Sequence, residues 1–109
     1  MQKLLIEGYK LYEQVIRDSS FSIRHSKVGQ KFEMIYDDIV RRREDPQDPK
    51  SWFFKLYHPD ESHPSVHGSY LASCIFYKTI FEKSPLGLSY KPNGISEEEK
   101  LFLQKVANV

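Results

Sequence analysis

The chain has 109 residues, of which 39% are hydrophobic, 28% charged and 14% aromatic, a composition that excludes collagen-like, low-complexity and disordered proteins. A domain of this length buries roughly 65% of its unfolded surface, so its core needs no disulfide or metal. The 16 basic and 15 acidic side chains leave a net charge of +1, too balanced for a nucleic-acid binder or a polybasic membrane anchor. We therefore expect one domain that binds neither nucleic acid nor membrane and needs no cofactor.

The sequence shows neither a membrane-spanning segment nor a secretory signal. No run approaches the about 18 apolar residues of a membrane-spanning helix, and the segment Met1–Glu7 becomes charged too early for a secretory signal. The chain as written is therefore expected to be cytoplasmic. Its single cysteine, Cys74, has no intramolecular partner and lies in an apolar stretch, so we expect a small buried hydrophobe rather than a catalytic thiol.

The first half of the chain predicts two helices joined through a short strand. Apolar residues recur at intervals of three and four over residues 2–18, typical of a helix that buries one face. Alternation over residues 21–24 predicts a strand, and a second helix is expected from about residue 30 to 43. The side chains expected to face inward are Leu5, Tyr9, Tyr12 and Ile16 in the first helix and Phe32, Ile35, Tyr36, Ile39 and Val40 in the second.

The second half predicts two further helices with clear start signals. Residues 52–57 are bulky and apolar, which fits a short buried strand or a packed loop, and the prolines of residues 58–65 define a loop. Ser65 is the expected N-cap of a largely buried helix over residues 66–81, whose Gly68 would allow close approach to neighbouring backbone. Ser96 and Glu99 have the spacing of a capping box at the start of a terminal helix.

One pair of residues in the proline-flanked loop has the chemistry of catalysis. Asp60 precedes His63 by three residues, so its carboxylate can accept the imidazole Nδ1 proton and fix the tautomer. The Nε2 atom is then available as a general base toward a hydroxyl nucleophile. Asp60 and His63 are therefore the candidate catalytic residues.

The sequence around this pair resembles the last conserved block of the SGNH, or GDSL-like, hydrolase superfamily. The run from Leu56 to Cys74 contains Leu-Tyr, Asp-x-x-His-Pro-Ser and Gly-x-Tyr-Leu-Ala. Ser84–Gly87 is similar to the Ser-Pro-x-Gly segment of the same branch, residues 94–104 to its terminal helix, and Val28-Gly29 to its Pro-Val-Gly segment, where Lys27 replaces the proline. The resemblance implies that Asp60 orients His63, which serves as the base and acid of an ester-hydrolysing triad.

The same resemblance implies an incomplete domain. The family's nucleophile lies in a Gly-Asp-Ser segment, and an oxyanion-hole asparagine lies in Gly-x-Asn-Asp; neither motif occurs here. The resemblance therefore implies an α/β fold, with residues 1–109 forming the C-terminal part of a three-layer flavodoxin-like sandwich, mostly helical in this segment. It also implies an ester-type small-molecule or carbohydrate substrate if an N-terminal half completes the site, and little hydrolysis by this chain alone. Missing strands would expose an apolar face and favour a homo-oligomer or a partner segment.

Several alternatives accompany this interpretation. Ser62 and Ser65 flank His63 too closely to present a hydroxyl to its Nε2 atom while Asp60 holds Nδ1. A metal site would use His58, His63 and His67 with Asp60, and the arginines 41–43 could bind an anion, although a helix end also favours cations. A non-catalytic interaction domain derived from the hydrolase fold is the rival function. A small helical binding module unrelated to hydrolases predicts no contact between Asp60 and His63.

Overall fold

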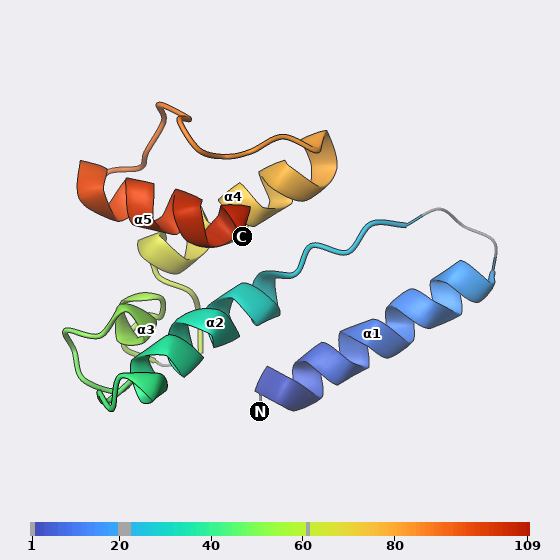
Figure 1. Cartoon of the computed structure of the whole chain (residues 1–109), viewed down its shortest axis with the longest axis horizontal. Coiled ribbons are helices and arrows are strands. Elements are labelled where there is room, and N and C mark those ends of the chain that lie inside the picture. Colours follow the sequence, from blue (N-terminus) through green and yellow to red (C-terminus); the bar gives the residue numbers. More distant parts are fainter. Residues whose placement is uncertain (1, 20–22, 61) are drawn as a thin grey trace.

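The computed structural model describes residues 2–19, 23–60 and 62–109, and the described part is helical (Figure 1). It contains the helices α1 (Gln2–Asp18), α2 (Val28–Arg41), α3 (Trp52–Lys55), α4 (Val66–Phe81) and α5 (Glu97–Asn108). No β-strand is found in these ranges; an isolated antiparallel bridge joins Tyr57 to Pro64. The expected α/β sandwich is therefore wrong for this chain, whereas the mostly helical pattern inferred from periodicity is confirmed.

The strand predicted at residues 21–24, in its described part, and the strand or packed loop predicted at residues 52–57 fail for different physical reasons. A strand needs a neighbour that pairs with its backbone, and residues 23–27 have an irregular backbone with no such neighbour in the described chain. Arg24 instead donates a hydrogen bond to the carbonyl of Ile80 (2.9 Å); Phe21 and Ser22 lie outside the described residues. The apolar stretch 52–57 begins as helix α3 because the Ser51 hydroxyl accepts hydrogen bonds from the two amides that follow Trp52.

The start signals of the last two helices are confirmed. The Ser65 side chain accepts a hydrogen bond from the amide of Gly68 at the start of α4. The Ser96 hydroxyl accepts one from the amide of Glu99, whose carboxylate accepts the Ser96 amide in return, which completes the capping box of α5. Both helices therefore begin where short-range sequence chemistry places them.

The core lies between α2, α4 and α5, with α4 and α5 forming the most extensive helix pair. Cys74 is buried in it, as predicted. Among the predicted inward residues of α2, Tyr36 and Val40 are 40% and 48% exposed, so their expected burial is wrong. The buried core residues are Phe32, Ile35, Ile39, Leu56, Tyr70, Leu71, Cys74, Ile75, Ile95, Leu103 and Ala107.

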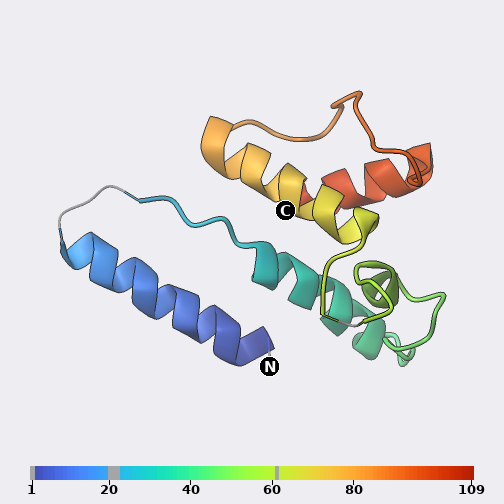
Figure 2. The same ribbon diagram turned by 180° about the vertical axis from the view of Figure 1, so that it is seen from behind.

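Helix α1 lies beside α2 and apart from α4 and α5 in two opposite views (Figures 1 and 2). Its predicted buried face is wrong: Ile6 is buried, whereas the apolar residues named for that face are 42% to 71% exposed. The helical period was correct, but the described chain covers that face only in part: Leu5 lines a cleft with residues of α2 and α3, and Tyr9 lies 6.1 Å from His25 between ring centres. No helix among the described residues has the length and apolar character needed to cross a membrane.

Candidate functional site

The loop between α3 and α4 is tied to the core at its base. The His58 amide donates to the His63 carbonyl (2.8 Å), and the Ser65 amide donates to the Leu56 carbonyl (2.9 Å). Leu56 itself is fully buried. A Cβ atom at Gly68 would lie 2.2 Å from the Leu56 carbonyl oxygen, which confirms that this glycine lets α4 approach the loop backbone. The tip of the loop, with Asp60 and His63, is therefore carried on a fixed base.

Asp60 holds His63 through both of its carboxylate oxygens. One oxygen, Oδ1, accepts the backbone amides of Ser62 and His63, each at 3.0 Å. The other, Oδ2, lies 2.6 Å from the imidazole Nδ1 of His63. The two backbone bonds orient the carboxylate before it meets the ring, so the pair predicted from the Asp-x-x-His spacing is formed.

The same hydrogen bonds stabilise the ionised carboxylate. The amides of His63 and Ser62, followed by the His63 side chain, lower the pKa of Asp60 well below its ordinary value. Asp60 is consequently an anion at neutral pH and accepts the Nδ1 proton of His63. This arrangement places the basic lone pair on Nε2 and stabilises the imidazolium that forms when Nε2 takes a proton.

The His63 ring is open to solvent and to an incoming group. Its side chain is 74% exposed, and Nε2 has no hydrogen-bond partner within the ranges that the structure describes.

The contact between Asp60 and His63 also contradicts the prediction made for a helical binding module unrelated to hydrolases.

The two neighbouring serines differ in their contacts. The Ser65 hydroxyl donates to the Lys55 carbonyl and accepts from the Gly68 amide, so its proton is already committed to the structure. Ser62 is exposed, and its backbone amide donates a hydrogen bond to the Asp60 carboxylate. A hydroxyl nucleophile for His63 must therefore be sought outside Ser65.

The remaining histidines of this region have separate surroundings. His67 places Nε2 3.0 Å from the Glu99 carboxylate, with the ring of Trp52 edge-on at 5.9 Å. Lys55 lies 3.7 Å from the same carboxylate, and His58 is exposed in the loop. Within the described ranges, no three His, Cys, Asp or Glu side chains come together to hold a metal ion, so the predicted alternative of a metal site has no ligand cluster there.

A cleft of about 720 Å³ adjoins the loop that carries Asp60 and His63. His58 and Ser62 belong to both the loop and the cleft wall. Aromatic contacts build the rest of that wall, with Phe53 lying 5.1 Å from Tyr36 and 5.3 Å from Tyr57 between ring centres. Its volume lies within the range of small-molecule sites. Sequence analysis missed this cleft because its walls come from α1, α2, the connection between α2 and α3, α3 and the loop, and no local motif reports such an assembly.

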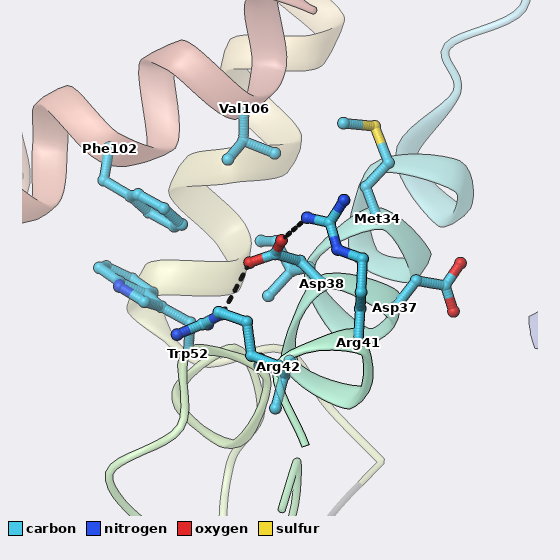
Figure 3. Close-up of a pocket in the computed structure, with 10 residues that line it drawn as sticks. Met34, Asp37, Asp38, Arg41, Arg42, Trp52, Phe102 and Val106 are labelled. Atoms are coloured by element: carbon cyan, nitrogen blue, oxygen red, sulfur yellow. Dashed lines mark hydrogen bonds and ion pairs between the residues drawn. The ribbon is translucent and has the colours of Figure 1, made fainter. Parts of the chain in front are cut away.

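A second cleft, of about 450 Å³, lies between α2, α3 and α5 (Figure 3). Trp52 and Phe102 stack on its edge with ring centres 4.3 Å apart. Asp38 pairs with Arg41 and with Arg42, whose Nε lies 3.1 Å from the carboxylate (Figure 3). Arg42 also pairs with a second carboxylate, that of Glu44. An anion bound at these arginines, the alternative predicted from the sequence, would have to compete with the carboxylates of Asp38 and Glu44.

Comparisons with family models, with curated proteins and with solved structures yield no match to this chain. Its function is therefore argued from the geometry of the Asp60–His63 pair, the adjoining cleft and the sequence of the loop.

Proposed function

We propose that this chain supplies the general base of a serine-type ester hydrolase, with His63 as the base and Asp60 as its orienting carboxylate. The observation that carries the proposal is the 2.6 Å contact between Asp60 Oδ2 and His63 Nδ1, in a ring whose side chain is 74% exposed. The resemblance of residues 56–74 to the hydrolase block supports the same roles.

The nucleophile and the oxyanion-hole donors come from another polypeptide segment in this proposal. No Gly-Asp-Ser or Gly-x-Asn-Asp motif occurs in the 109 residues, and the Ser65 hydroxyl is engaged by Lys55 and Gly68. A base without these groups provides neither covalent catalysis nor charge stabilisation. The proposed reaction is attack of a hydroxyl on an ester carbonyl, with His63 Nε2 taking the hydroxyl proton and returning it to the leaving alcohol.

The first test uses the chain alone. ¹⁵N NMR of the imidazole should report that the neutral form of His63 carries its proton on Nδ1, and Asp60→Ala should shift that form toward the mixed tautomers of a solvated histidine. His25, which lies outside the loop beside Glu13, is the internal reference. An unchanged His63 tautomer in Asp60→Ala would show that the carboxylate does not orient the ring.

The second test supplies the missing groups. The chain is co-expressed with the N-terminal half of an SGNH hydrolase that carries both missing motifs, and hydrolysis of p-nitrophenyl acetate is measured on the purified complex. We expect turnover that falls by at least about 10³-fold in His63→Ala and by about 10²–10⁴-fold in Asp60→Ala, with His25→Ala as the matched control. A folded complex that is inactive, or whose activity survives His63→Ala, would refute the proposal.

A further inference from the structure

The cleft beside the catalytic loop is walled by aromatic rings that stand at steep angles to one another. The ring planes of Phe53 and Tyr36 meet at 74°, and those of Phe53 and Tyr57 at 60°. All three rings line the cleft, together with Phe54 and Leu5. The face of an aromatic ring carries the negative part of its quadrupole. Rings arranged in this way are typical of sites that enclose an organic cation, above all a quaternary ammonium group.

Two carboxylates add negative charge to the same cleft. Glu33 and Asp37 line it from α2, on the same helix face as Tyr36, because intervals of three and four residues separate them. Figure 3 shows the Asp37 carboxylate pointing away from Asp38 and Trp52. Neither Glu33 nor Asp37 forms a hydrogen bond or ion pair with another described residue. Like charges four residues apart on a helix repel each other, so a cation bound beside them would relieve a repulsion that the chain leaves in place.

The lysine in the cleft wall does not cancel this charge. Lys3 is the one lysine or arginine among the described residues that line the cleft, so one ammonium group faces two carboxylates. Lys3 belongs to α1, is exposed, and forms no ion pair with Glu33 or Asp37 in the described structure. Charge complementarity therefore favours a cationic occupant over an anionic one.

The size and position of the cleft favour a small molecule. Its volume of about 720 Å³ lies within the range of about 300–1,000 Å³ found for small-molecule sites, and it exceeds what an ammonium group alone would fill. Ser62 lines the cleft and directly precedes His63 in the chain. A ligand held by its cationic end at the aromatic rings therefore has room to extend toward the catalytic loop.

We propose that this cleft binds a quaternary ammonium group and that the ligand carrying it is an ester of a quaternary amino alcohol. The rings of Tyr36, Phe53 and Tyr57 contact the methyl groups, and the carboxylates of Glu33 and Asp37 balance the positive charge. Binding of the cation depends on the cleft alone, whereas its assignment as the alcohol part of an ester rests on the proposed function. In that role hydrolysis consumes one water molecule and releases the quaternary amino alcohol and a carboxylic acid.

Binding of choline to the chain alone tests the cation site. Its uncharged tert-butyl analogue, which has carbon in place of the ammonium nitrogen, is the matched ligand of the same shape. In NMR titrations we expect choline to bind with a Kd of about 1 mM, ordinary for a ligand of this size, and at least about fivefold more tightly than the analogue. The ring faces should shift the N-methyl proton signal upfield. Equal binding of the two alcohols, or no binding of choline up to about 50 mM, would overturn the proposal.

Substitutions in the wall separate the effect of charge from that of shape. The double variant Glu33→Gln/Asp37→Asn should weaken choline binding by about fivefold or more and leave the neutral analogue unaffected. Tyr36→Leu, at a side chain that is 40% exposed, should weaken choline binding by about three- to tenfold, and Lys3→Gln should strengthen it. Glu98→Gln, at an exposed carboxylate of α5 outside the cleft, is the matched control. Choline affinity that survives both the carboxylate and the ring substitutions, in variants shown by circular dichroism to be folded, would contradict the site.

Hydrolysis by the complex with a complementing N-terminal half tests the ester assignment. Acetylcholine is compared with the acetate ester of the uncharged analogue. We expect kcat/KM to be at least about fivefold higher for acetylcholine, and Glu33→Gln/Asp37→Asn should bring the ratio close to one. Equal hydrolysis of both esters by the parent complex would refute the assignment of the cleft to the alcohol part. Choline binding without hydrolysis of either ester would instead refute the proposed hydrolytic function and leave the cation site standing.

Discussion

Replacement of Gly68 by alanine tests how the base of the catalytic loop is held. The added Cβ atom would lie 2.2 Å from the Leu56 carbonyl oxygen, 3.1 Å from Cβ of Pro64 and 3.2 Å from the Leu56 carbonyl carbon. The first contact is with backbone, so a side-chain rotation cannot relieve it. Either α4 or the segment that ends α3 must move.

The expected loss of stability is the sum of three effects. Overpacking costs about 1–3 kcal/mol, and displacement of the Ser65 amide from the Leu56 carbonyl, now at 2.9 Å, costs about 1 kcal/mol. Alanine restores about 1 kcal/mol because it is the better helix former. We therefore expect Gly68→Ala to lower the free energy of unfolding by about 2 kcal/mol.

Gly8→Ala is the matched control, because it is the same substitution in a helix with nothing within 4 Å of the new Cβ atom. It should stabilise the fold by about 0.5–1 kcal/mol. Urea unfolding followed by circular dichroism, at one fixed protein concentration, measures both changes. A Gly68→Ala variant as stable as the parent, or stabilised like Gly8→Ala, would refute the close approach of α4 to Leu56.

Three further changes test other parts of the structure. Gln104→Leu should lower the free energy of unfolding by about 2–4 kcal/mol, because the buried amide makes hydrogen bonds with Tyr70, Leu88 and Gly87 and leucine removes all three; a neutral effect in thermal unfolding would contradict this. Ser96→Ala should cost about 1 kcal/mol through loss of the capping box, measured by urea unfolding beside Ser73→Ala, which removes an exposed hydroxyl. The pKa of Asp60 lies below its ordinary value of 3.8, so the stabilisation of the loop is complete above about pH 4 and is lost as the pH falls toward the lowered pKa. A ¹³C NMR titration that finds Asp60 half protonated at pH 3.8 would refute that reasoning.

Short-range chemistry made the helix boundaries and caps predictable. Ser65 and Ser96 cap α4 and α5 through contacts within three residues, and the period of apolar residues located α1 over its full length. The strand predicted at residues 21–24 failed at the described Ile23 and Arg24 because pairing depends on a distant segment. The burial predicted for α1 failed for a related reason: periodicity identifies the apolar face of a helix but not whether another element covers it.

In the candidate site, too, contacts between sequence neighbours were predictable and contacts between distant segments were not. The Asp60–His63 contact was predictable because a carboxylate three residues before a histidine, in a loop bounded by prolines, is positioned by two adjacent amides. The pair formed by His67 and Glu99 was not, because 32 residues separate them and only the packing of α4 against α5 brings them together. The aromatic cleft beside the loop likewise depends on five separate parts of the chain.

The orientation of His63, on which the proposed chemistry depends, is set locally. The orientation of His63 depends on bonds within residues 60–63 and on a base clamped at Leu56 and Gly68, none of which involves α1. A substitution on the exposed surface of α1, such as Leu11→Lys at a side chain that is 70% exposed, should therefore leave the His63 tautomer unchanged, whereas Gly68→Ala should disturb it without touching the ring.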